Sequence, residues 1–140
     1  MRVLTLLFFA QMFTSAQDSK ILKAHQWKHR LVIAHVVDAD ARAVAESWKQ
    51  AQDEATMRHL KLVDVSAEPI QVDGSVRPDK AEMEVVRGSV GIESPDQSVF
   101  VLVGKDGGIK ARQQGKLDLN AFFALIDAMP MRQREMRARR

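Results

Sequence analysis

The sequence contains no cysteine, and this absence excludes several classes of function at once. Disulfide bonds, disulfide exchange and peroxide reduction by a thiolate all need a cysteine side chain. The 140 residues therefore cannot act as a thiol oxidoreductase or a thiol peroxidase. They must also be held by a packed core rather than by disulfides, and a chain of this length is long enough to form one.

Long apolar runs are equally scarce. The N-terminal stretch MRVLTLLFFAQMFTSAQ has a positive charge at Arg2, an apolar run over residues 3–10, and small residues up to Ala16. This order is typical of a secretory signal peptide. A membrane-spanning helix needs ~20 apolar residues, and Gln11 interrupts the run well before that length. We predict a signal peptide over residues 1–16 with cleavage near Ala16, and hence a periplasmic or secreted protein.

Excess positive charge is confined to one segment. The net charge is +3, yet residues 132–140 (RQREMRARR) alone carry +4, so the rest of the chain is almost neutral. A nucleic-acid partner is therefore not expected. The basic segment has two interpretations, a mobile solubilising tail or an anchor to an anionic membrane surface. Its arginines are Arg132, Arg134, Arg137, Arg139 and Arg140. We expect one domain over residues 17–131, followed by this tail.

The clearest local pattern is a hairpin near residue 104. Residues 99–103 (VFVLV) are continuously apolar, which is typical of a strand buried on both faces. Asp106-Gly107 then predicts a tight turn of the primed type. After the turn, Ile109 and Ala111 alternate with Lys110 and Arg112, as in a charged edge strand.

Two further strands and three helices are predicted from hydrophobic periodicity. Residues 31–37 and 60–65 are the strands, and in the second Leu60 and Leu62 face the opposite side from Val63. The first helix spans residues 41–60, the second begins near Pro78, and the third begins after Asp118. Their expected N-caps are Asp38 or Asp40, Ser75 or Asp79, and Asp118. Residues 21–30 fit either a helical turn or an extended lead-in, in which Ile21 and Trp27 pack inward.

The resulting order is β-α-β-α-β-β-α. A helical crossover makes the first two strands parallel, and the hairpin makes the last two antiparallel. The expected fold is an α/β four-stranded mixed sheet with helices on both faces.

Three sequence blocks carry a resemblance to a known family. They are WKHRLVIAHVVD at residues 27–38, VFVLVGKDGGIK at 99–110 and IDAMPMRQREM at 126–136. Together with the element order, they resemble a thioredoxin-like family of unknown function. Its members occur as lone domains in exported bacterial proteins and within animal extracellular-matrix proteins that carry sushi repeats or coiled coils. The resemblance implies a thioredoxin-like fold without an established activity.

The resemblance also locates the place where a thioredoxin would carry its chemistry. The CxxC pair of a thioredoxin would fall at residues 38–42, which here hold no thiol. The cis-proline of a thioredoxin would fall at the start of the third strand, at Ser98 and Val99, and Pro95 lies a few residues too early. The resemblance therefore carries over the fold and not the redox chemistry.

Candidate ligand-binding residues lie at the end of the first strand. Asp38, Asp40, Arg42 and His35 stand where open α/β sheets place their ligands, and together they suit a cation or an amine. The alternative is that the carboxylates only cap the next helix. His25 and His29 are spaced as half of a zinc or copper site, but supporting ligands are lacking. We therefore predict no metal site, no cofactor and no catalytic residue.

Three functions remain open from the sequence. The preferred one is an exported, non-catalytic binding module for a protein or small ligand of the cell envelope. The second is a metal- or carboxylate-dependent enzyme that uses Asp38 and Asp40. The third is a membrane-surface adaptor that acts through the basic tail.

Overall fold

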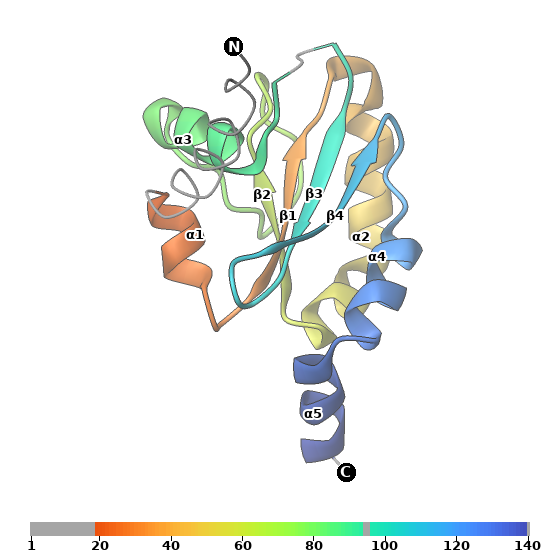
Figure 1. Cartoon of the computed structure of the whole chain (residues 1–140). Helices are drawn as coiled ribbons and strands as arrows, with labels where there is room; N and C mark the ends of the chain where they lie inside the picture. The colour runs from red at the N-terminus through yellow and green to blue at the C-terminus, as the bar shows by residue number, and fades with distance from the viewer. Residues whose placement is uncertain (1–18, 94–95, 140) are drawn as a thin grey trace, which may run out of the picture.

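The sheet has the four predicted strands, within a computed structural model that describes residues 19–93 and 96–139 (Figure 1). The predicted signal peptide and Pro95 lie outside the described residues. The strands are β1 (Arg30–His35), β2 (Leu60–Asp64), β3 (Val99–Val103) and β4 (Ile109–Gln114). The helices are α1 (Lys20–His25), η2 (Asp38–Asp40), α2 (Ala41–Met57), α3 (Lys80–Val90), α4 (Leu119–Asp127) and α5 (Pro130–Ala138).

The strand order in the sheet is β2-β1-β3-β4. Strands β1 and β2 are parallel, with Arg30 opposite Leu60, while β1 pairs antiparallel with β3 and β3 with β4. The predicted mixed α/β sheet is therefore confirmed. Because the helical crossover carries the chain outward from β1, β2 becomes an edge strand, and the central positions go to the two most apolar strands.

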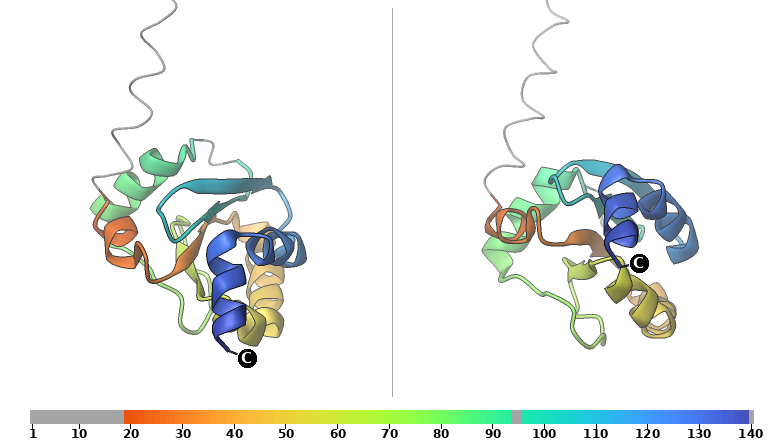
Figure 2. Two further views of the ribbon diagram at one scale, coloured as in Figure 1. Left: turned by 60° about the horizontal axis from the view of Figure 1, so that its bottom comes forward. Right: turned by 90° about the horizontal axis from the view of Figure 1, so that it is seen from below.

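Helices lie on both faces of the sheet (Figures 1 and 2), and a separate hydrophobic core lies on each face. Helices α2 and α4 contribute Trp48, Phe122 and Ile126 to one core, where they pack with Leu60 and Leu62 of β2. Helices α1 and α3 cover the other face, on which Val63 lies. The predicted alternation of side chains along β2 is thus confirmed. Because a core lies on each face of the sheet, the central strands β1 and β3 are apolar on both sides.

The hairpin between β3 and β4 forms as predicted, but its turn is longer than the primed two-residue type. The N–H of Gly107 donates to the carbonyl of Gly104 (3.0 Å), and Gly104 N–H donates to the carbonyl of Gly108 (2.9 Å). Gly107 has φ +85°, and the register shifts at Val103. The loop is therefore a four-residue β-turn that ends at a left-handed glycine and is followed by a bulge. This geometry is compatible with the right-handed twist of the two strands.

Helix ends follow the predicted caps in two of three cases. Asp79 accepts a hydrogen bond from the N–H of Glu82 (2.8 Å) at the start of α3, and Asp118 accepts one from Ala121 (3.1 Å) at the start of α4. Helix α2 has Asp40 at its N-cap position, but no side chain caps it. The expected capping role of Asp38 and Asp40 is therefore wrong.

The segment before β1 is helix α1 followed by a turn that contacts the hairpin. The N–H of Trp27 donates to the carbonyl of Lys105 (2.6 Å), and Trp27 has φ 68°. Its side chain is 63% exposed, so the expectation that Trp27 packs inward is wrong. Its backbone, rather than its indole ring, joins this turn to the β3–β4 hairpin.

The basic C-terminal segment is part of helix α5, which begins at Pro130 and so crosses the expected boundary between domain and tail. Pro130 fits the first turn because that turn needs no N–H from it. None of the helices in the described parts of the chain is both long and apolar enough to cross a membrane.

Candidate binding site

The loop after β1 holds a carboxylate in the place where the resemblance puts a thioredoxin's thiols. The hydroxyl of Ser98 donates to Oδ2 of Asp40 (2.6 Å) and accepts from the N–H of Val37 (3.1 Å). Ser98 is fully buried at the start of β3. This pair links the end of β1 to the start of β3, and it explains why the Asp40 carboxylate does not cap α2.

The four residues predicted as a ligand set are not brought together. Arg42 projects into solvent, with its side chain 93% exposed and Nε 3.7 Å from a carboxylate oxygen of Glu46. His35 is buried within β1, whereas Asp38 is exposed. The carboxylate of Asp40 is hydrogen-bonded to Ser98. This end of the sheet therefore presents one engaged carboxylate rather than a converging set of ligands.

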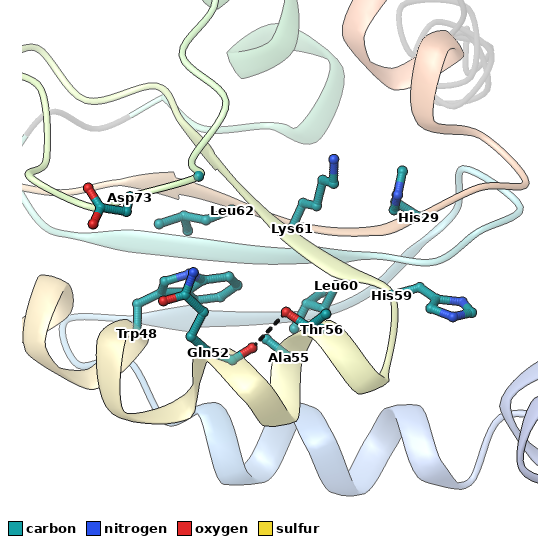
Figure 3. Close-up of a pocket in the computed structure, with 11 residues that line it drawn as sticks. His29, Trp48, Gln52, Ala55, Thr56, His59, Leu60, Lys61, Leu62 and Asp73 are labelled. Carbon is teal, nitrogen blue, oxygen red and sulfur yellow. Dashed lines mark hydrogen bonds between the residues drawn. The ribbon is translucent and has the colours of Figure 1, made fainter.

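A hollow lies between α2 and the outer edge of β2 (Figure 3). We call this cavity of about 340 Å³ the β2 groove. Trp48 and Ala55 of α2 contribute apolar surface, and Gln52 and Thr56 of the same helix contribute polar groups. The remaining lining residues are His29, His59, Leu60, Lys61, Leu62, Asp73 and Gly74.

The far wall of the β2 groove is positioned by a buried aspartate. Asp64, at the end of β2, is 1% exposed. Its carboxylate accepts hydrogen bonds from the N–H groups of Ser66 (2.9 Å) and Ile70 (2.8 Å) and from Nη1 of Arg77 (3.0 Å). These bonds hold the loop that carries Asp73 beside α2. The sequence suggested only which face of β2 Asp64 occupies, not this organising role.

Histidines and lysines gather at the other end of the β2 groove. Nδ1 of His25 lies 3.1 Å from Nδ1 of His29, and Nζ of Lys105 lies 2.7 Å from Nδ1 of His59. Burial, followed by the charge of Lys61, lowers the pKa of His29, and burial followed by the charge of Lys105 lowers the pKa of His59. Both imidazoles are therefore neutral at pH 7.

A lysine ammonium group can only donate hydrogen bonds, so Nδ1 of His59 accepts one from Lys105 and the ring proton of His59 is on Nε2. His25 and His29 approach each other as the spacing of a half-site predicted. Within residues 19–93 and 96–139, however, no group of three or more His, Asp or Glu side chains is arranged to hold a metal ion.

Lys105 and Arg30 are held by a carboxylate of α5. Glu135 accepts hydrogen bonds from Nη1 (3.1 Å) and Nη2 (3.2 Å) of Arg30 and from Nζ of Lys105. Arg30 is 1% exposed and Lys105 8%. Burial alone would raise the pKa of Glu135, but the hydrogen bonds from Arg30 and Lys105 outweigh it and lower the pKa to about 2. Glu135 thus binds these cations rather than Arg139, the partner its sequence spacing favours.

The arginines of the predicted tail divide into a buried and an exposed group. Arg132 is 4% exposed, donates to the carbonyl of Met57 (2.9 Å) and lies near Asp127. It faces the protein interior, so its assignment to a membrane-contacting surface is wrong. The side chains of Arg134, Arg137 and Arg139 are exposed, and Arg140 lies outside the described residues.

Residues 21–135 match the model of a protein family described as a domain of unknown function, DUF4174. The chain belongs to this family. A search of solved structures shows a similarity to the crystal structure of Plasmodium vivax 2-Cys peroxiredoxin in the reduced form, with a TM-score of 0.53 and 12% sequence identity. The alignment covers 81% of this chain and 72% of the peroxiredoxin. No curated protein matches the chain significantly.

The structural similarity establishes the fold alone. A peroxiredoxin has a thioredoxin fold, so the expected thioredoxin-like architecture is confirmed, and the family match agrees with a domain of unknown function. The name 2-Cys peroxiredoxin refers to cysteines that this sequence lacks. The likeness therefore says how the chain folds and nothing of what it binds.

Most residues of the β2 groove were not predicted from the sequence. In the sequence, Trp48 belongs to the apolar stripe of a helix and Asp73 to a segment of loop composition, and neither pattern indicates a groove. The sequence signal for this edge of the sheet is Lys61, a charged residue within a short apolar strand, because charges are one means by which an edge strand avoids pairing with another chain. That signal gains its meaning only once β2 is known to be at the edge of the sheet.

Proposed function

We propose that the protein is an exported, non-catalytic binding module whose ligand occupies the β2 groove. The observation that carries the proposal is the β2 groove itself, in which apolar and polar side chains from α2 and β2 line one cavity. The thiol position of the fold holds the bonded Asp40–Ser98 pair and borders a smaller hollow of about 290 Å³, whereas the β2 groove lies beside Trp48 and β2. A sequence without cysteine has no thiol with which to turn a bound substrate over.

The composition of the β2 groove supports ligand binding. Small-molecule sites are clefts of roughly 300–1,000 Å³ with an apolar lining and a few placed polar groups. The β2 groove has such a volume, with apolar surface from Trp48, Ala55, Leu60 and Leu62. A second hollow continues it along α2 toward Glu46 and Lys49 and shares Trp48 with it.

Export is supported by the N-terminal sequence, through its early charge at Arg2, its apolar run and the small residues before Ala16. N-terminal sequencing of the protein recovered from the envelope or medium of its native host tests this part. We expect a mature chain that begins near Gln17. Recovery of an intact Met1 would contradict export with cleavage.

Binding in the β2 groove can be tested by nuclear magnetic resonance. Spectra of ¹⁵N-labelled protein are recorded with three separate probe pools, namely free tripeptides, monosaccharides and small carboxylic acids. We expect at least one pool to shift the Trp48 indole signal and the amide signals of Gln52 and Thr56, while the probes themselves stay chemically unchanged. Shifts that gather around Asp40 and Ser98 instead, or conversion of a probe to product, would refute the proposal.

A pair of matched variants gives the control. Thr56 lines the β2 groove and is exposed at the surface of α2, so Thr56→Phe fills the cavity. Asp53→Phe places the same ring on an exposed position of the same helix that does not line the cavity. Thr56→Phe should abolish the shifts, and Asp53→Phe should preserve them.

The two alternatives receive less support. The enzyme hypothesis needs Asp38 and Asp40 to act together, but the Asp40 carboxylate is already bonded to Ser98. The membrane hypothesis is reduced to the exposed arginines of α5, because Arg132 is buried.

A further inference from the structure

The outer edge of β2 is covered over only half of its length. Val76 forms a parallel bridge to Val63, in which its N–H donates to the carbonyl of Leu62 and its carbonyl accepts from the N–H of Asp64, both at 2.8 Å. This bridge pairs the half of the edge that lies beyond Leu62. The preceding half fronts the β2 groove, where Leu60 and Leu62 are lining residues.

The unpaired backbone groups can be identified from the ladder. The N–H of Arg30 donates to the carbonyl of His59 (2.8 Å), and the N–H of Val65 donates to the carbonyl of Ala34 (2.9 Å), so odd-numbered residues of β2 bond to β1. In a strand the even-numbered residues then direct their backbone groups outward. Among the described residues, nothing pairs with the N–H or carbonyl of Leu60 or with the N–H of Leu62.

The covering chain ends at a glycine. If the strand containing Val76 continued backward, residue 74 would bond to Leu60 and Leu62. Gly74 instead has φ +77° and turns the chain away, so that Asp73 and Gly74 become a wall of the β2 groove. Leu60 is 3% exposed and Leu62 1%, so these backbone groups are nearly buried as well as unpaired. A buried, unpaired N–H is unfavourable, and a ligand that accepts its hydrogen bond removes that cost.

The β2 groove is lined by one acidic residue, Asp73, and one lysine, Lys61, which lie toward opposite ends of it. Asp73 lies at one end, and His29 and His59 at the other (Figure 3). Lys61 lies on the side of His29 and makes no ion pair within the described chain. The Nε2–H group of His59 remains a hydrogen-bond donor because Lys105 occupies Nδ1. A peptide that runs antiparallel to β2 would place its carboxyl terminus near Lys61 and its amino terminus near Asp73.

From this arrangement, and resting on the proposed function, we propose that the ligand of the β2 groove is a short extended peptide with a free C-terminal carboxylate. The peptide adds to the free edge of β2, where its backbone bonds to Leu60 and Leu62, in the manner of β-strand addition. The cavity is too small for a long chain, because an extended peptide advances ~3.3 Å per residue. The uncovered part of the edge runs from Leu60 to Leu62, so a peptide of about three residues would cover it.

The test compares the pool of free tripeptides with the same pool amidated at the C-terminus, again on ¹⁵N-labelled protein. Free tripeptides should shift the amide signal of Leu62 downfield and slow its exchange with solvent, because that N–H gains an acceptor. They should bind at least tenfold more tightly than the amidated pool. Lys61→Gln should remove the tenfold preference, whereas Lys80→Gln, at an exposed position in α3, should preserve it.

The outcomes separate this inference from the proposed function. If small carboxylic acids or monosaccharides shift the Trp48 signal and tripeptides do not, the peptide inference fails and the binding module stands. If free and amidated pools bind equally, or Lys61→Gln leaves their ratio unchanged, the assignment of the carboxylate to Lys61 is refuted. If no pool shifts any signal of the β2 groove, both proposals fail.

Discussion

Replacing Glu135 by Gln should destabilise the fold strongly at neutral pH and weakly in acid. The carboxylate binds Arg30 and Lys105, both nearly inaccessible to solvent. Removing one partner of a buried ion pair leaves an uncompensated charge, which is far more costly than the loss of a surface pair. The side chain of Glu135 is itself only 16% exposed, so water screens the interaction little.

The magnitude follows from proton linkage. The pKa of Glu135 falls from 4.5 to about 2 on folding. Each unit of pKa is worth about 1.4 kcal/mol, so ionised Glu135 contributes about 3 kcal/mol to the free energy of unfolding at pH 7. Because the pKa is depressed in the folded state, this contribution is complete above pH 4.5 and is lost as the pH falls through about 2. By pH 3 about half of it should remain.

Urea denaturation of the wild type and of Glu135→Gln at pH 7, pH 4 and pH 3 measures the effect. The difference in unfolding free energy should be about 3 kcal/mol at pH 7 and should shrink as the pH falls. Glu84→Gln is the matched control, because Glu84 is 73% exposed and pairs with Arg87 at the surface. It should cost less than about 1 kcal/mol. A Glu135→Gln difference that is below 1 kcal/mol, or that does not change with pH, would refute the reasoning.

Three further outcomes are expected from other parts of the fold. Ser98→Ala should lower the unfolding free energy by about 1–3 kcal/mol, since it leaves the Asp40 carboxylate without its donor, and a double-mutant cycle with Asp40→Asn should show coupling. Gly107→Ala should cost about 1 kcal/mol in thermal denaturation, because φ +85° strains any residue with a Cβ. Proton titration by nuclear magnetic resonance should place His29 and His59 below pKa 6.5, so their contribution to stability falls as the pH drops below that value; titration at or above 6.5 would contradict their burial beside lysines.

The parts of the fold that sequence predicts are those with local causes. The hairpin follows from a β-branched run and an Asp-Gly pair, and the caps at Asp79 and Asp118 follow from the preference of short acidic side chains for free N–H groups. The two-faced character of β1 and β3 follows from their continuous apolar runs. Each of these signals lies within a few residues of the structure that it specifies.

The features that the sequence does not reveal join distant positions. Glu135 and Arg30 are 105 positions apart, and Ser98 and Asp40 are 58 apart. The i, i+4 spacing of a helix would pair Glu135 with Arg139, because spacing within an element is the only proximity that a single sequence encodes. The β2 groove likewise depends on the edge position of β2 and on the turn at Gly74, which are properties of the topology.

The C-terminal helix and the β2 groove are connected through one lysine. Lys105 donates to Glu135 and also lies 2.7 Å from Nδ1 of His59, so the carboxylate that holds α5 in place also fixes the lysine that sets the tautomer of a groove residue. Lys105 thus contacts both Glu135 and His59. The basic C-terminal segment, which is predicted from the sequence as a tail, therefore supports the side of the molecule on which the ligand is proposed to bind.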